Sequence, residues 1–142
     1  MPKVAVWLVR ASLIHLLSGA IIGASYLTWR ATGALVFAAS HRQVHVEQML
    51  IGWLVQLVIG VAWWILPRTE GSQSKAAGVL IWVVFALLNL GVLSAALGTT
   101  PPLPEALLPA GRVAETVAVA LFASLAWNRQ RAYRAATRRV LV

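Results

Sequence analysis

Long apolar runs alternate with short polar segments along the chain, and this pattern predicts four helices that cross a membrane. A helix needs about 20 consecutive apolar residues to cross the hydrocarbon core. Four apolar runs of roughly this length predict spans over residues 4–28, 43–66, 76–97 and 112–127. Pro67 would end the second span, because proline lacks the N–H that a helix interior needs. The pattern therefore predicts an all-α fold, an integral membrane four-helix bundle that forms one domain over residues 1–142.

Composition agrees with a membrane protein. Hydrophobic residues make up 60% of the chain and charged residues 11%, whereas soluble domains carry about 25% charged residues. The net charge of +8 does not indicate a nucleic-acid partner, because the basic residues lie at the helix ends and not on one solvated face. Because the chain has no cysteine, thiolate metal sites and C-x-x-C-H haem attachment are excluded.

The basic residues also predict the orientation of the spans. Lys and Arg near span ends are retained on the cytoplasmic side of the membrane. One side would hold Lys3, Arg68, Lys75 and the arginine-rich tail at 128–142, and the other side Arg30, Arg42 and Arg112. We therefore expect a multi-pass protein of the cell inner (plasma) membrane with both termini in the cytoplasm. The tail would lie as a helix on the anionic inner leaflet or remain solvated.

Polar and small residues follow one face of the second predicted span. At roughly 100° per residue, one stripe contains His45, Gln48, Gly52, Gln56 and Trp63, with His41 one turn above and Gly60 at the edge. A histidine can supply an imidazole nitrogen to a haem iron or another metal. Gly52 and Gly60 would let a planar ring approach the backbone. Alternatively, these glycines only let two helices pack closely, which is their commonest role in membranes.

The first predicted span has a similar face, formed by Ser12, His15, Gly19, Ile22 and Tyr26. Gly19-x-x-x-Gly23 also matches a small-residue packing motif. His15 would lie near the middle of the span, where an ionisable side chain indicates a functional site. A structural alternative is a neutral imidazole that is hydrogen-bonded to Gln56 or Asn89.

The two histidines are predicted to lie at different depths. With a rise of about 1.5 Å per residue, His15 should lie roughly 20 Å below the outer end of its helix and His45 within about 5 Å of its own. A single haem could not easily have both histidines as its ligands. The candidates for a second ligand are His41, the His45 of a second protomer, or an open position.

Two further groupings involve the acidic residues. His41 and His45 are four residues apart and Glu47 is close by, a spacing that suits copper or another small metal site but also an ordinary solvated helix start. Glu115 follows Arg112 by three residues, which favours an ion pair. Alternatively, Glu115 could hydrogen-bond a ligating imidazole.

The segment from His45 to Arg68 resembles a known membrane helix. The motif consists of H-x-E, Gly52-Trp53, Gln56, Gly60-Val61-Ala62, Trp64 and Pro67-Arg68. It resembles the histidine-bearing second helix of the large subunit of haem-copper oxidases and nitric oxide reductases, and above all the small four-span proteins that carry only this part of that fold. The resemblance implies that His45 is an axial ligand of haem b. The later spans and the histidine-ligated copper site of the large subunit have no counterpart here, so one chain is not expected to reduce oxygen or nitric oxide.

These observations lead to two functional hypotheses. In the first, a homodimer binds haem b through His45, Gln48 and Gln56 hydrogen-bond the haem edge or the imidazole, and Arg42, Arg30 or Arg112 pairs with the propionates. The role would be electron transfer or redox sensing, with a redox partner or quinone beside the lipid bilayer. In the second, the chain is a cofactor-free accessory or assembly subunit that docks on a respiratory complex through Gly19-x-x-x-Gly23 and the tryptophan-rich second span.

Overall fold

The computed structural model describes residues 1–33, 40–67, 75–99 and 102–140, and the ordered elements within them are all helices. They are α1 (Lys3–Thr32), α2 (Ser40–Glu47), the π-helix η1 (Gln48–Val55), α3 (Gln56–Ile65), α4 (Lys75–Gly98) and α5 (Leu107–Val140). Because α2, η1 and α3 follow one another without a break, they act as a single span. Among the described residues, four helices are long and apolar enough to cross a membrane. This confirms the predicted all-α fold and supports the four predicted spans.

The helix ends follow from local sequence. Gly33 ends α1 in the left-handed conformation, with φ of 67°, and its N–H donates to the Trp29 carbonyl over 2.8 Å. Glycine is favoured at this position because it has no Cβ to clash there. α3 ends at Ile65, two residues before Pro67, as predicted. Arg68, the last residue of the resembling segment, lies outside the described residues.

The fourth span is longer than the sequence predicted. α5 includes 34 residues and runs from Leu107 to Val140. Residues 128–140, where the sequence predicted a surface helix or a solvated tail, thus continue the helix of the fourth span. Its candidate membrane-crossing part is Leu107–Ala135. The segment beyond Trp127 contains no glycine or proline and is rich in alanine and arginine, which favour an unbroken helix.

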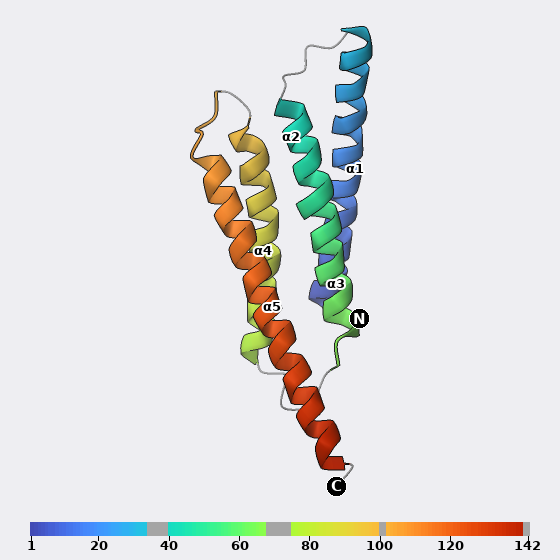
Figure 1. The fold of residues 1–142 in the computed structure, drawn as a ribbon, viewed down its shortest axis with the longest axis vertical. Coiled ribbons are helices and arrows are strands. Elements are labelled where there is room, and N and C mark those ends of the chain that lie inside the picture. The colour runs from blue at the N-terminus through green and yellow to red at the C-terminus, as the bar shows by residue number, and fades with distance from the viewer. Residues whose placement is uncertain (34–39, 68–74, 100–101, 141–142) are drawn as a thin grey trace.

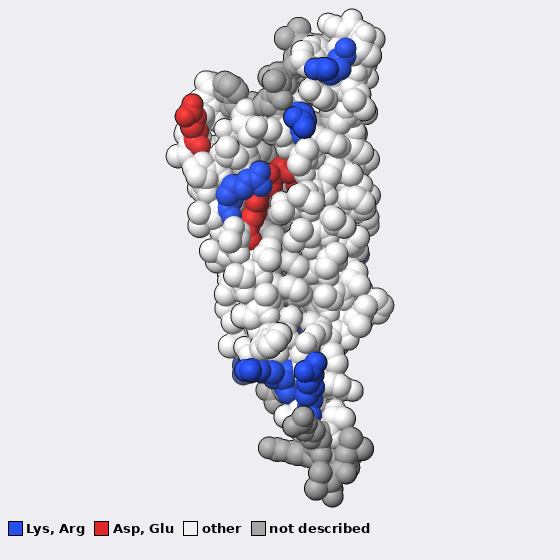
Figure 2. Space-filling view, in the orientation of Figure 1, with Lys and Arg blue, Asp and Glu red and all other residues white. Residues whose placement is uncertain are grey.

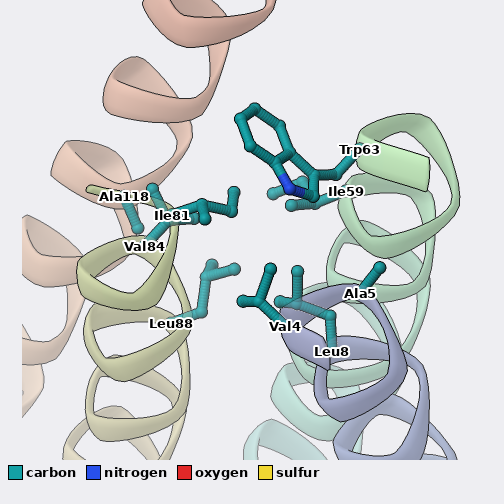
Figure 3. Packing of buried hydrophobic residues seen from close by; sticks show 9 residues of the cluster. All are labelled: Val4, Ala5, Leu8, Ile59, Trp63, Ile81, Val84, Leu88 and Ala118. Atoms are coloured by element: carbon teal, nitrogen blue, oxygen red, sulfur yellow. The ribbon is translucent and has the colours of Figure 1, made fainter. Parts of the chain in front are cut away.

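The helices form two hairpins that pack side by side (Figure 1). α1 packs along the α2–η1–α3 span, and α4 packs along α5. An apolar cluster joins the hairpins in the half of the bundle nearer the chain termini (Figure 3). Its members are Val4, Ala5, Leu8, Ile59, Trp63, Ile81, Val84, Leu88 and Ala118. The polar residues considered below therefore lie largely in the other half.

Small residues bring α4 and α5 into close contact. A Cβ on Gly111 would lie 2.6 Å from both the Ala95 backbone nitrogen and the Gly91 carbonyl oxygen. Backbone atoms cannot move aside as a flexible side chain can. The α4–α5 hairpin therefore depends on glycine at position 111.

We expect Gly111→Ala to destabilise the protein by about 1–3 kcal/mol, the usual cost of overpacking a tight interface. Gly78→Ala is the matched control, because a Cβ there meets nothing within 4 Å. Alanine also favours a helix interior over glycine. Thermal unfolding in detergent should show a Tm below that of the wild type for Gly111→Ala, and no such decrease for Gly78→Ala. Equal Tm values for the two variants would contradict the assigned packing.

Candidate functional site

His45 lies in the interface between α2 and α1. Its Nδ1 atom is 2.8 Å from the Gly19 carbonyl oxygen, so the ring N–H donates to the backbone of α1. The imidazole ring lies over Gly23, where a Cβ would come within 2.5 Å of Nδ1. Donation from Nδ1 selects the tautomer that leaves a lone pair on Nε2. The His45 ring is thus held in one orientation with Nε2 able to act as a ligand.

The packing motif of the first span serves this interface. Gly19 is buried against Gln48 and Met49, and Gly23 accommodates the ring of His45. Both glycines therefore contact the second span of the same chain. They do not form the exposed docking surface on which the accessory-subunit hypothesis relied.

His15 is buried at the centre of a hydrogen-bond network that joins both hairpins. Its Nδ1 contacts the Gln48 side-chain oxygen, and its Nε2 lies 3.1 Å from Asn89 Oδ1 on α4. Ser18 donates to the same Gln48 oxygen over 3.1 Å, and Gln56 donates to Asn89 Oδ1 over 3.5 Å. The predicted contact between His15 and Asn89 is confirmed. Gln56 bonds to Asn89, which in turn contacts His15. The contact between His15 and Gln48 was not predicted.

The glycines of the second span take different places in the structure. A Cβ on Gly52 would lie 2.6 Å from Cγ of His15, so the planar ring beside Gly52 is the chain's own imidazole. Gly60 faces Leu8 and Val9 of α1, and a Cβ there would lie 2.9 Å from Leu8 Cβ. Gly60 thus has the close-packing role that the sequence left open as an alternative. The predicted polar stripe is the buried face, since Gln48, Gly52 and Gln56 all point inward.

The helix register separates His15 from His45. His15 lies at the level of Gly52, whereas His45 comes seven positions earlier on the same span. At 1.5 Å per residue this offset is about 10 Å along the helices. Both His15 nitrogens also have partners already. The register supports the prediction that these two imidazoles of one chain do not share an iron.

The proposed metal-ligand set of His41, His45 and Glu47 is not brought together. His45 bonds to α1, whereas Glu47 pairs with Arg112 of α5. Residues two apart on a helix point about 200° apart, so these side chains leave α2 on nearly opposite faces. Within the described residues there is no group of three His, Cys, Asp or Glu side chains that could hold a metal ion.

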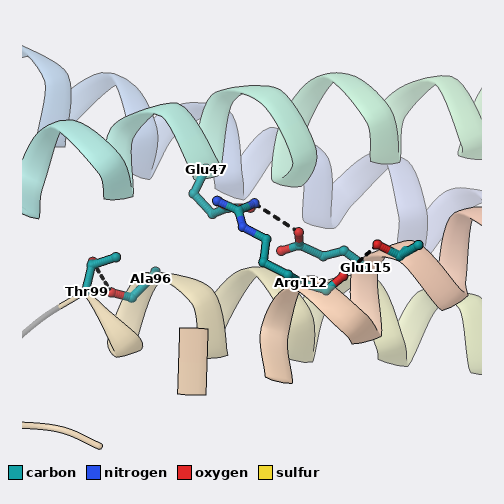
Figure 4. Close-up of polar contacts among 6 residues, drawn as sticks. Glu47, Ala96, Thr99, Arg112 and Glu115 are labelled. Carbon is teal, nitrogen blue, oxygen red and sulfur yellow. Dashed lines mark hydrogen bonds and ion pairs between the residues drawn. The ribbon is translucent and has the colours of Figure 1, made fainter. Parts of the chain in front are cut away.

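Two buried glutamates share one arginine at the interface between the hairpins (Figure 4). Arg112 Nη2 lies 2.5 Å from Glu47 Oε2, and Nη1 lies 3.1 Å from Glu115 Oε2. The Glu47 and Glu115 side chains are 4% and 7% exposed, whereas that of Arg112 is 52% exposed. The predicted ion pair between Arg112 and Glu115 is confirmed. The sequence missed Glu47 as a partner, although a buried carboxylate in a membrane span requires a basic neighbour.

A cavity of about 620 Å³ lies beside this cluster, between α2 and the α4–α5 hairpin. Arg42, Glu47 and Arg112 line it together with Gln43 and Thr99. Its apolar walls are Val46, Ala95, Leu108, Pro109 and Val113. Figure 2 shows acidic and basic side chains in contact on an otherwise largely uncharged part of this face. The sequence pattern did not predict the cavity, because its walls come from three separate spans.

Arg129 ties the two hairpins together at the opposite end. Its guanidinium carbon lies 4.4 Å from the centre of the Trp63 ring. The same side chain donates to the Pro67 carbonyl over 2.9 Å and to the Trp63 carbonyl over 3.2 Å. The Trp63 carbonyl lies in the last turn of α3, where the residue four positions later is Pro67, which has no N–H to donate. Arg129, which the sequence assigned to a basic tail, thus caps α3.

The chain matches no family model, no curated protein and no solved structure. The resemblance of residues 45–68 to the haem-copper oxidase helix therefore stays a prediction. Function is therefore inferred from the arrangement of His45, His15 and the glutamate pair.

We expect Asn89→Leu to lower stability by about 1–2 kcal/mol, because His15 Nε2 and the Gln56 amide would lose a partner inside the membrane. Thr116→Val is a suitable control, since the exposed Thr116 hydroxyl bonds only to the Arg112 carbonyl of its own helix. Unfolding in detergent measures both variants. If Asn89→Leu were as stable as the control, the network would not join the hairpins.

We expect Arg112→Gln to destabilise the protein by about 1–3 kcal/mol, because two buried carboxyl groups would lose the cation that they share. The triple variant Glu47→Gln, Glu115→Gln, Arg112→Gln removes all three charges and should be more stable than Arg112→Gln alone. Unfolding of both proteins in the same detergent tests this order. The reverse order would show that the arginine does not compensate the carboxyl groups.

Proposed function

We propose that the protein is a membrane-embedded haem b protein with a role in electron transfer or redox sensing, in which His45 is an axial ligand. The observation that carries the proposal is the hydrogen bond from His45 Nδ1 to the Gly19 carbonyl, 2.8 Å long. A metal-ligating histidine almost always donates its second ring N–H to a carbonyl or carboxylate, which fixes the tautomer and the ring orientation. The donor chemistry at His45 therefore fits a haem iron.

The chain's own residues would divide the work at this site. Gly19 orients the imidazole through its carbonyl oxygen, and Gly23 leaves room for the ring. Of the three arginines predicted to pair with the propionates, Arg42 and Arg112 line the cavity on the other side of α2. We therefore propose Arg30, which is exposed in the last turn of α1, as the propionate partner. Gln48 and Gln56 already bond within the His15 network, so they support the helix interface and not a haem edge. Haem b would supply a reversible one-electron couple of its iron.

The proposal includes a homodimer whose second copy provides the other axial ligand, its own His45. Support comes from His15, whose two ring nitrogens are both engaged inside the chain. Apolar side chains of α1 and η1, including Leu17, Ile21 and Leu50, are at least half exposed and could meet a second copy. We also propose that both termini face the cytoplasm across the inner membrane, since the arginine-rich end of α5 favours that side.

A reduced-minus-oxidised absorbance spectrum of the protein purified in detergent tests haem binding. We expect Soret and α bands in the wild type and their loss in His45→Gly, because the iron would lose its ligand. Added imidazole should restore the bands in His45→Gly, since free imidazole can replace the missing ring.

His15→Gln serves as the matched control for a buried histidine. It should lower stability but retain the haem bands, because His15 has no nitrogen free for iron. A colourless wild-type protein, or a His45→Gly spectrum identical to that of the wild type, would rule out the assignment.

A further inference from the structure

We propose that the cavity between α2 and the α4–α5 hairpin binds a neutral, lipid-soluble hydroquinone through the carboxyl group of Glu47. The proposal rests on the cavity, on the unpartnered buried oxygen of Glu47, which lines it, and on the charges around it. It does not depend on haem binding at His45, which lies on the other face of α2.

The size and walls of the cavity suit an apolar ring. Its volume of about 620 Å³ lies within the range of roughly 300–1,000 Å³ that is usual for small-molecule sites. The apolar walls come from α2, α4 and α5, all parts of candidate membrane spans. A ligand that reaches this cavity from the bilayer must therefore be soluble in lipid.

The polar end of the cavity offers hydrogen-bond acceptors. Glu47 and Glu115 each use one oxygen on Arg112, and the second oxygen of each, Oε1, is buried without a partner. Of these two residues, Glu47 is the one that lines the cavity. An unpaired carboxyl oxygen costs free energy in a medium without water. Because Glu47 lines the cavity, a hydroxyl group bound there can approach its carboxyl group. The side chain is only 4% exposed, so water competes little for this hydrogen bond.

The charges favour a neutral ligand over an ion. Arg42 and Arg112 stand against Glu47 and Glu115, so the formal charges around the cavity cancel. The two arginines would repel a bound cation, and the Glu47 carboxylate would repel a bound anion. A hydroquinone carries a hydroxyl at each end of a flat ring. One hydroxyl can donate to Glu47 while the other meets Gln43 or Thr99 at the polar part of the lining.

Calorimetric titration of the detergent-purified protein with decylubiquinol, kept reduced under argon, tests the proposal. We expect saturable binding to the wild type. The dimethyl ether of the same molecule keeps the ring and the tail but lacks both O–H donors. Its affinity should be at least tenfold lower, because charge-assisted hydrogen bonds to a buried carboxylate are strong.

Glu47→Gln should also weaken decylubiquinol binding at least tenfold, because an amide is a poorer acceptor than a carboxylate. Glu105→Gln is the matched control, since Glu105 is exposed and does not line the cavity, and its affinity should not change. Should Glu47→Gln fail to fold, the affinities of the wild type for decylubiquinol and for its dimethyl ether still test the proposal.

Three results would overturn the proposal. They are equal affinities for decylubiquinol and its dimethyl ether, unchanged affinity in a folded Glu47→Gln protein, and no saturable binding at all. In the last case, a proton shared by the two carboxyl groups would account for the unpaired oxygen atoms.

Discussion

The structure depends on one constraint, which is that a polar group inside a bilayer must find its partner within the protein. Water is absent from the hydrocarbon core, and an unsatisfied group there costs several kcal/mol. For most of their buried polar groups, the two hairpins satisfy this constraint through each other, at three levels along the bundle. Arg112 joins Glu47 to Glu115, His15 reaches Asn89, and Arg129 caps the end of α3. The same contacts therefore satisfy buried groups and fix how the hairpins meet.

Glycine makes these contacts possible within closely packed helices. The ring of His45 lies over Gly23, that of His15 over Gly52, and the side chain of Glu115 over Gly91. In each case a Cβ on the glycine would come within 2.8 Å of the polar side chain. The sequence left two roles open for the glycines, close helix packing and room for a planar ring. In the structure these two roles coincide. The helices approach closely because the large polar side chain of one fits over the glycine of the other.

Local patterns predicted what depends on local sequence. The four spans, the end of the second span before Pro67 and the ion pair within α5 follow from short stretches of sequence. The contact between His15 and Asn89 was also predicted, because few polar residues are available inside the spans. The partnership of Glu47 with Arg112 could not be predicted in the same way. It depends on which hairpin faces which, and periodicity along one helix contains no information about that choice.

The arrangement around α2 has a consequence for how the two proposed sites relate. His45 and Glu47 are two residues apart, yet one bonds to α1 and the other to Arg112 of α5. The His45 site therefore lies between α2 and α1, within the first hairpin, whereas the cavity lies between α2 and the second hairpin. The two side chains therefore share no hydrogen-bond partner among the described contacts. A change that affects both sites must then act through α2 itself, whose position is set by the packing of Gly19 and Gly23 on one face and by Arg112 on the other.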